Sequence, residues 1–321
     1  MTSPLDKDTF TPPAPLQTAV LFLVFNRPEP TAKVFQEIRK AKPPRLYIAA
    51  DGPRAARDGE AEKVDMVRRI VEKVDWPCDV KTLFREHNAG CKYAVSSAID
   101  WFFEQEAEGI ILEDDCLPSQ SFFWFCEAML DRYRNDNRVW QISGTTFFAD
   151  KITITDADYF FSRYGPIWGW ASWRRAWQHY DVELQNWSNM KQPEVMASVY
   201  PSAYERVAKR NIGDALVTNQ IDTWDYQWAF IKAYSSALTI LAVQNQIVNI
   251  GFGSDATHTI AKPSSVPAHS FTVSAPIKHP KFVIADRFYE QNYAKKMFKK
   301  TGILFRIFGR IKALLQGVIC R

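Results

Sequence analysis

The stretch GIILEDD at residues 109–115 decides how this chain folds. Its apolar part is a short continuous run, which is typical of a strand buried on both faces of a sheet. The run ends directly in Glu113, Asp114 and Asp115. Adjacent carboxylates repel one another, so this strand end predicts a divalent cation, because oxygen-rich sites bind Mg²⁺ or Mn²⁺. A solvated turn that begins a helix is the alternative, since acidic residues favour helix N-termini.

Strands and helices alternate on both sides of this stretch. We expect strands at 19–25, 46–50, 79–84, 109–112 and 138–143, and helices at 30–41, 58–74, 91–107 and 119–134. The alternation predicts an α/β fold with a mostly parallel sheet flanked by helices. Ligands bind beyond the carboxyl ends of the strands in such sheets. Asn26, Arg27 and Asp51 follow two other expected strands, so we expect them to lie near the acidic triplet.

The pattern changes after residue 145. Seven of the 11 tryptophans fall between Trp168 and Trp228, and the segment YGPIWGWASW at 164–173 interleaves aromatic residues with glycine. We interpret this part as an irregular, aromatic-rich substrate platform, with packing in a core as the alternative. The chain then divides into a flexible arm at 1–18, a first half at 19–145, a second half at 146–294 and a tail at 295–321.

Charge and cysteine content exclude several classes of protein. The net charge is +4, but the tail holds eight basic residues and no acidic one, so the other 32 basic and 36 acidic residues give −4. A negatively charged body argues against nucleic-acid binding. The five cysteines are irregularly spaced without a CxxC, no apolar signal core is present, and no apolar run is long enough for a membrane-spanning helix. We therefore expect a protein of the reducing cytoplasm.

Two motifs in the second half carry candidate chemistry. In WDYQW at 224–228, Asp225 lies between two tryptophans. Large rings exclude water from a carboxylate, which suits a general base, although a helix whose tryptophans face the core would show the same pattern. In GFGSDATH at 251–258, small residues permit close approach to a phosphate, and Ser254 and His258 add polar groups. A flexible loop is the alternative for this second motif.

Taken in order, these segments resemble the GT-A class of nucleotide-sugar glycosyltransferases, with the best match to N-acetylglucosaminyltransferase I and its bacterial relatives. The resemblance covers about residues 19–260 and rests on IILEDD (110–115), SFFWFCEAML (121–130), RVWQISG (138–144), IWGWASW (167–173), WDYQW (224–228) and GFGS (251–254). It implies a GT-A-type sheet whose first half binds a nucleotide-sugar donor, expected to be UDP-linked. The second half would bind a glycan or lipid-linked saccharide acceptor.

The resemblance also implies a role for each matching residue. Asp225 is the expected catalytic base, and Asp115 is the expected direct ligand of Mn²⁺ or Mg²⁺, with His258 as a second candidate ligand. The expected donor contacts are Asn26, Arg27, Asp51 (which would hold uracil), Lys92, Glu113, Asp114 and Ser254 (which would contact the diphosphate). The expected acceptor contacts are Trp168, Trp170 and Trp224. The sequence departs from the family in two respects: it shows no N-terminal membrane anchor, and the local sequence HNAGCK at 87–92 lacks a clear match to an expected histidine.

These roles imply a single displacement that inverts the anomeric configuration. The metal, with Arg27 or Lys92, would neutralise the departing nucleoside diphosphate, while Asp225 takes a proton from the acceptor hydroxyl. Three alternatives remain: a sugar nucleotidyltransferase, a non-catalytic carbohydrate-binding protein of the same fold, and a hydrolase of the sugar nucleotide. A nucleotidyltransferase needs a glycine-rich loop after the first strand, where this chain reads FNRPEP at 25–30.

The tail has the pattern of a basic amphipathic helix. On a helical wheel one face is apolar, and Arg306, Arg310 and Lys312 lie on the other side; the apolar face comprises Ile303, Leu304, Ile307, Phe308, Ile311, Leu314, Leu315, Val318 and Ile319. Such a helix suits the surface of an anionic membrane. It predicts peripheral attachment at the cytoplasmic face, as in the biosynthesis of a cell-surface polysaccharide. Docking of the tail on the body or on a second subunit is the alternative.

Overall fold

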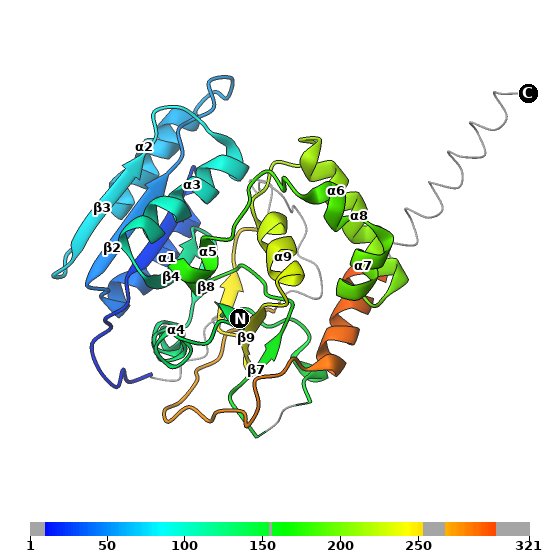
Figure 1. Cartoon of the computed structure of the whole chain (residues 1–321). Coiled ribbons are helices and arrows are strands. Elements are labelled where there is room, and N and C mark those ends of the chain that lie inside the picture. Colours follow the sequence, from blue (N-terminus) through cyan, green and yellow to red (C-terminus); the bar gives the residue numbers. More distant parts are fainter. Residues whose placement is uncertain (1–9, 154–155, 253–266, 300–321) are drawn as a thin grey trace, which may run out of the picture.

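One sheet carries strands from both halves of the chain (Figure 1). The computed structural model describes residues 10–153, 156–252 and 267–299. Within these ranges the sheet has eight strands, in the order β3-β2-β1-β4-β8-β6-β9-β7. They are β1 (Val20–Val24), β2 (Arg45–Ala50), β3 (Asp79–Phe84), β4 (Glu108–Glu113), β6 (Val139–Ser143), β7 (Tyr159–Ser162), β8 (Trp170–Trp173) and β9 (Leu238–Ala242). The five strands expected from the first half are confirmed.

The sheet is mostly parallel, as its sequence predicts. The strand β1 pairs in parallel with β2 and β4, so Val24 lies beside Ala50 and Leu23 lies beside Glu113. Among the described strands only β7 and β8 run against the others. The register brings the residues that follow β1, β2 and β4 to one edge of the sheet.

Helices cover both faces of the sheet and form two separate core layers. On one face, Val20 and Phe22 pack with α1 (Pro28–Ala41), α2 (Glu60–Val71) and α4 (Gln120–Arg132). On the other, Leu21 and Leu23 pack with α3 (Gly90–Gln105), α5 (Arg174–Trp177) and α9 (Asp225–Tyr234). Because side chains alternate across a strand, the continuous apolar run of β1 supplies both layers.

The second half forms more regular strands and helices than its sequence indicates, so the expectation that it is irregular is wrong. Its segment Trp170–Trp173 forms β8, which enters the sheet between β4 and β6. Strands β7 and β9 complete the same sheet, so residues on both sides of position 145 share it. A short ribbon joins β10 (Ile247–Asn249) to β5 (Cys116–Pro118), directly after the acidic triplet.

A helical subdomain lies beside α9 and is built from the second half. It contains α6 (Trp187–Met190), α7 (Pro193–Val199) and α8 (Ala203–Val217). A further helix over 287–299, orange in Figure 1, lies next to α7 and α8. The remaining short helix is the 3₁₀ turn η1 (Ala149–Lys151).

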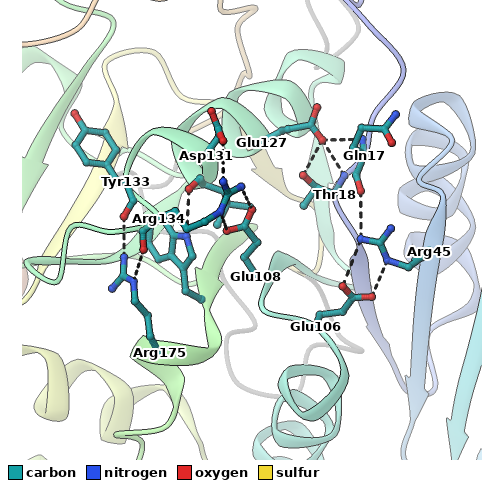
Figure 2. A network of polar contacts seen from close by, with 12 residues as sticks. Gln17, Thr18, Arg45, Glu106, Glu108, Glu127, Asp131, Tyr133, Arg134 and Arg175 are labelled. Atoms are coloured by element: carbon teal, nitrogen blue, oxygen red, sulfur yellow. Dashed lines mark hydrogen bonds and ion pairs between the residues drawn. The ribbon is translucent and has the colours of Figure 1, made fainter.

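The edge of the sheet where the parallel strands begin is held by a polar network (Figure 2). Glu127 of α4 accepts hydrogen bonds from the backbone N–H groups of Gln17 and Thr18 at 2.7 and 2.8 Å. Arg45, at the start of β2, pairs with Glu106 at 2.7 Å. Partly exposed pairs of this kind contribute modestly to stability. They fix the start of β1 and β2, while the other ends of these strands face a cavity.

The described part of the N-terminal arm packs against the body. Leu16 is buried, the ring of Phe10 lies 5.4 Å from that of Trp124, and the indole N–H of Trp124 donates to the carbonyl of Ala14 at 2.6 Å. The expectation of a flexible arm at 1–18 is therefore corrected for residues 10–18. Residues 1–9 lie outside the described part of the chain.

Candidate active site

A cavity of about 840 Å³ opens at the carboxyl edge of the parallel strands. Residues from both halves of the chain line it. Eight of the residues singled out in the sequence are among them: Arg27, Asp51, Glu113, Asp114, Asp115, Trp168, Trp224 and Asp225. Their common position follows from the topology, because the register of β1, β2 and β4 brings three of these segments to one edge.

Arg27 joins two of the three adjacent acids. Its guanidinium donates to both carboxylate oxygens of Asp114, and its Nη1 lies 3.0 Å from Oδ2 of Asp115. Burial acts to lower the pKa of Arg27, but the charges of Asp114 and Asp115 outweigh it and raise that pKa. Gly251 packs against this pair, since a Cβ there would come within 2.7 Å of Arg27 Nη1 and closer still to Asp115. A side chain at position 251 would therefore displace the ion pair.

The other carboxyls of the triplet have perturbed proton affinities. Burial raises the pKa of Glu113 well above its ordinary value, and the charges of Asp115 and Asp114 add to this effect. Burial also raises the pKa of Asp114 to about 6, although the charge of Arg27 opposes it. Oε1 of Glu113 is buried and has no hydrogen-bond partner among the described residues. A buried acceptor without a partner is costly, so it marks a place where a ligand would be favoured.

Asp51 lines the cavity, but its carboxylate is engaged by the protein. It accepts hydrogen bonds from Asn88 Nδ2 at 2.9 Å and from the backbone N–H groups of Gly52, Ala89 and Gly90 at 2.9–3.2 Å. A carboxylate offers about four lone-pair sites, so Asp51 is saturated as a cap of α3. Contact with a base through this carboxylate would require loss of one of these bonds.

A second acid completes the cap on α3. Asp222 accepts from the backbone N–H groups of Cys91 and Lys92 at 3.0 and 2.9 Å. The N–H groups at the start of a helix usually need such acceptors. Because Asp51 and Asp222 satisfy them, this helix terminus is occupied by the protein's own carboxylates.

Asp225 begins α9 and lines the same cavity as the acidic triplet. It accepts a hydrogen bond from the Thr223 hydroxyl, which fixes its carboxylate. The preceding ring, Trp224, is 2% exposed and stacks on Trp170 with 5.7 Å between the ring centroids. Trp228 is fully buried in the same cluster. The tryptophans on either side of Asp225 thus face the core, and its carboxylate stays on the cavity side.

Several predicted site residues lie elsewhere. Asn26 donates to Glu60 at 2.9 Å, and the ammonium of Lys92 pairs with Glu183 at 2.8 Å, so neither lines the cavity. Trp170 is fully buried in the core, where its ring does not reach the cavity. The predicted contacts Ser254 and His258 lie outside the described residues.

Comparisons with known proteins are weak. No family model matches the chain, and no curated protein matches it. Among solved structures, TarS 1–349 of S. aureus has 10% identity and a TM-score of 0.38, with 72% of this chain and 59% of TarS covered. HddC from Yersinia pseudotuberculosis has 9% identity and a TM-score of 0.30, with 50% and 78% covered. Mouse xyloside xylosyltransferase 1, apo form, has 10% identity and a TM-score of 0.32, with 68% and 81% covered.

At these TM-scores none of the three likenesses decides a function. The α/β fold rests on the strand order and register described above. The more specific likeness to N-acetylglucosaminyltransferase I stays a prediction from the sequence motifs.

The described residues supply some of the ligands that a divalent cation needs. Within the described ranges no three His, Cys, Asp or Glu side chains are arranged around a common metal position. Magnesium-type sites often use one or two carboxylates, with substrate phosphates and water completing the shell. Asp115 lines the cavity beside the unpartnered oxygen of Glu113, which suits such a site. Arg27 now neutralises Asp115, so an incoming cation would compete with that ion pair.

The cavity contains basic residues that the sequence did not single out. Arg54 and Arg85 line the side of the cavity near Asp51, and Lys209 of α8 and Lys232 of α9 line the side formed by the helical subdomain. Lysines within amphipathic helices usually face solvent, so no local signal distinguished these two. Both are buried, at 6% and 1% exposed.

Lys232 should make stability depend on pH. Burial lowers its pKa from the ordinary 10.5 to about 7, and the charge of Lys209 adds to this. Between pH 7 and 10 the unfolded chain therefore binds more protons than the folded chain, so stability rises with pH by at most about 1.4 kcal/mol per unit. Lys232→Met should remove this slope, giving a difference on the order of 2 kcal/mol between pH 7 and 9.

Urea unfolding of the wild type and Lys232→Met at pH 7, 8 and 9 measures this slope. Lys191→Met is the matched control, because Lys191 is partly exposed and paired with Asp214. Parallel pH profiles for the wild type and Lys232→Met would show that Lys232 keeps its ordinary titration.

Proposed function

We propose that this protein is a glycosyltransferase. It moves a sugar from a nucleotide-diphospho-sugar, expected to be UDP-linked, to a hydroxyl of a glycan or lipid-linked saccharide. The observation that carries the proposal is a cavity lined both by the acidic triplet after β4 and by Asp225 of the second half. A donor held at the sheet edge and an acceptor held by the second half would meet between these carboxyls.

The donor end of the site is argued from charge. The leaving nucleoside diphosphate gains negative charge as the glycosidic bond breaks, and groups placed where that charge develops lower the barrier. Arg27 is positioned at this edge by Asp114 and Asp115. A Mn²⁺ or Mg²⁺ ion held by Asp115 would supply further positive charge there. The buried oxygen of Glu113 would accept a hydrogen bond from a hydroxyl of the donor sugar.

The acceptor end is argued from the position of Asp225. Its carboxylate is fixed by Thr223 and faces the cavity. It would accept the proton of the acceptor hydroxyl as that oxygen attacks the anomeric carbon from the face opposite the diphosphate. The partly exposed ring of Trp168, which also lines the cavity, would pack against a sugar.

One base and one displacement predict inversion. The anomeric configuration of the product should be opposite to that of the donor. The NMR coupling constant of the anomeric proton in the isolated product measures this directly. Retention of configuration would contradict the role proposed for Asp225.

The proposed function is tested in two steps. A thermal-shift screen of uridine, guanosine and thymidine diphospho-sugars with Mn²⁺ identifies the donor. Mass spectrometry of reactions with and without a panel of saccharide acceptors then separates transfer from hydrolysis. Failure to bind any nucleotide sugar would contradict the proposal. So would formation of a nucleotide sugar from a nucleoside triphosphate and a sugar phosphate, with no glycoside produced.

We also propose that the protein attaches peripherally to the cytoplasmic face of a membrane. Residues 300–321 of the predicted basic tail lie outside the described part of the chain. The segment before it exposes large apolar side chains, with Phe282 68%, Ile284 61% and Phe288 52% exposed. Lys278 and Lys281 precede Phe282 in the sequence, and Asp286 and Arg287 lie between Ile284 and Phe288. Apolar side chains with basic neighbours suit an anionic lipid surface. None of the helices in the described ranges has the length and apolar character needed to cross a bilayer.

Co-sedimentation with liposomes containing anionic lipid tests the attachment. The full chain should pellet with the liposomes, and binding should weaken as salt rises, because the attraction of basic residues to lipid is screened. A chain ending at residue 299, which keeps the described helix, should remain in the supernatant. Equal sedimentation of both chains would assign the tail to packing and remove the membrane proposal.

A further inference from the structure

One part of the cavity is built by the helical subdomain and has no role in the transfer step proposed above. We call it the lysine chamber. Its lining comes from the loop at 163–166, from Tyr200 between α7 and α8, from α8 and α9, and from the helix over 287–299. The residues that define it are Tyr164, Tyr200, Lys209, Lys232, Tyr293 and Phe298.

Lys209 places a buried ammonium group in this chamber. It is 6% exposed, and among the described residues it has neither a hydrogen-bond partner nor a carboxylate within 4.0 Å. Its Nζ lies 4.7 Å from the ring centroid of Phe298, 5.6 Å from that of Phe230 and 5.8 Å from that of Tyr200. Aromatic faces attract a cation, but they do not neutralise its charge.

Lys232 adds a second buried ammonium group. Its Nζ donates to Gln141 Oε1 and, at 2.8 Å, to Thr239 Oγ1. Both partners are neutral, and within the described ranges no carboxylate pairs with it. An ammonium group has three donors, so one N–H remains beyond these two bonds.

The acids nearest to the chamber are engaged by other groups. Glu290 forms a two-pronged ion pair with Arg163, with contacts of 2.7 and 3.0 Å. Glu205, one turn before Lys209 on α8, accepts a hydrogen bond from the Tyr164 hydroxyl at 2.6 Å, and burial raises its pKa. Burial lowers the pKa of Lys209, and the charges of Glu205 and Asp225, neither of which forms an ion pair with it, oppose this effect. Among the described residues, none of these acids forms an ion pair with Lys209 or Lys232.

A buried ammonium group without an anionic partner is costly, so burial lowers the pKa of both lysines, and an anion in the chamber would stabilise their charged forms. We propose that the lysine chamber binds an acidic group, a carboxylate or a phosphate, of the acceptor saccharide, with Lys209 in direct contact. The aromatic rings around Lys209 would pack against the apolar faces of the sugar that carries this group. The assignment to the acceptor rests on the proposed glycosyl transfer, because the donor diphosphate is expected at Arg27.

Binding of simple sugars to the full chain tests this assignment. The probes are glucose, glucuronate and glucose 6-phosphate, measured by ligand-observed NMR titration. Wild type should bind at least one of the two acidic sugars more tightly than glucose, and the better of the two identifies carboxylate or phosphate. Lys209→Met should weaken that binding about 10- to 100-fold, as expected for loss of a charge-assisted hydrogen bond. Lys191→Met, outside the cavity, should bind like wild type.

Titration with UDP and Mn²⁺ separates this inference from the proposed function. Lys209→Met should bind UDP as wild type does; a parallel loss of UDP binding would place Lys209 at the donor and overturn the inference. Equal binding of acidic and neutral sugars by wild type would also overturn it, even if Lys209→Met fails to fold. Wild type that binds UDP but no acidic sugar keeps the proposed function and loses the inference. If wild type binds acidic sugars through Lys209 but binds no nucleotide, the inference stands and the proposed function is contradicted.

Discussion

The Asp225→Asn variant should lose about 10²- to 10⁴-fold in kcat while its affinity for the nucleotide sugar stays within about twofold of wild type. The amide can still accept the hydrogen bond from Thr223, so the start of α9 should keep its conformation. It cannot accept a proton from the acceptor hydroxyl. Because the hydrogen-bond partner of the Asp225 carboxylate is Thr223, its replacement should leave the contacts of Arg27 with the acidic triplet in place.

Steady-state transfer rates and calorimetric binding of the nucleotide sugar measure the two effects separately. Asp65→Asn is the matched control, because Asp65 is an exposed residue of α2 far from the cavity lining. Loss of binding together with rate would indicate a structural role for Asp225. An unchanged transfer rate would show that Asp225 is not the general base.

Much of the fold could be predicted because the first half is locally consistent. The strands around Leu21, Ile48 and Ile111 are short apolar runs, and the helices between them carry clear amphipathic patterns. The second half could not be predicted in the same way. Strand β8 is only four residues long, and its two tryptophans read equally well as a binding surface. Its place between β4 and β6 depends on long-range pairing, which no local pattern encodes.

The candidate site shows a similar division. Arg27, the acidic triplet and Asp225 come from strand and helix ends, where sequence and topology together predict exposure to a cavity. The sequence did not predict that Asp51 caps α3. The N–H groups that its carboxylate accepts from belong to a helix that begins 39 residues later. The burial of Lys209 could not be predicted for another reason, because a lysine on an amphipathic helix usually faces solvent.

The other large effect should follow removal of the divalent cation. Arg27 pairs with two of the three adjacent carboxyls, Asp114 and Asp115, and no cation among the described residues pairs with Glu113. A nucleoside diphosphate would bring further negative charge next to these carboxyls. Like charges at close range in a partly enclosed site cost several kcal/mol, so a divalent ion is expected to enter with the donor. EDTA and Asp115→Asn should each lower kcat/KM by about 10²- to 10³-fold.

The ion pair between Arg27 and Asp115 makes this prediction selective. If the metal holds the diphosphate, Asp115→Asn should abolish the response of donor binding to Mn²⁺, and Asp65→Asn should retain it. If Arg27 alone holds the diphosphate, Arg27→Met should abolish donor binding, whereas EDTA should have no effect on the wild type. Calorimetric titrations of the nucleotide sugar with Mn²⁺ and with EDTA distinguish the two arrangements. Donor affinity that is unchanged by EDTA and by Asp115→Asn would show that Arg27 performs the neutralisation for which a metal is proposed, and the acidic triplet would then serve to position that arginine.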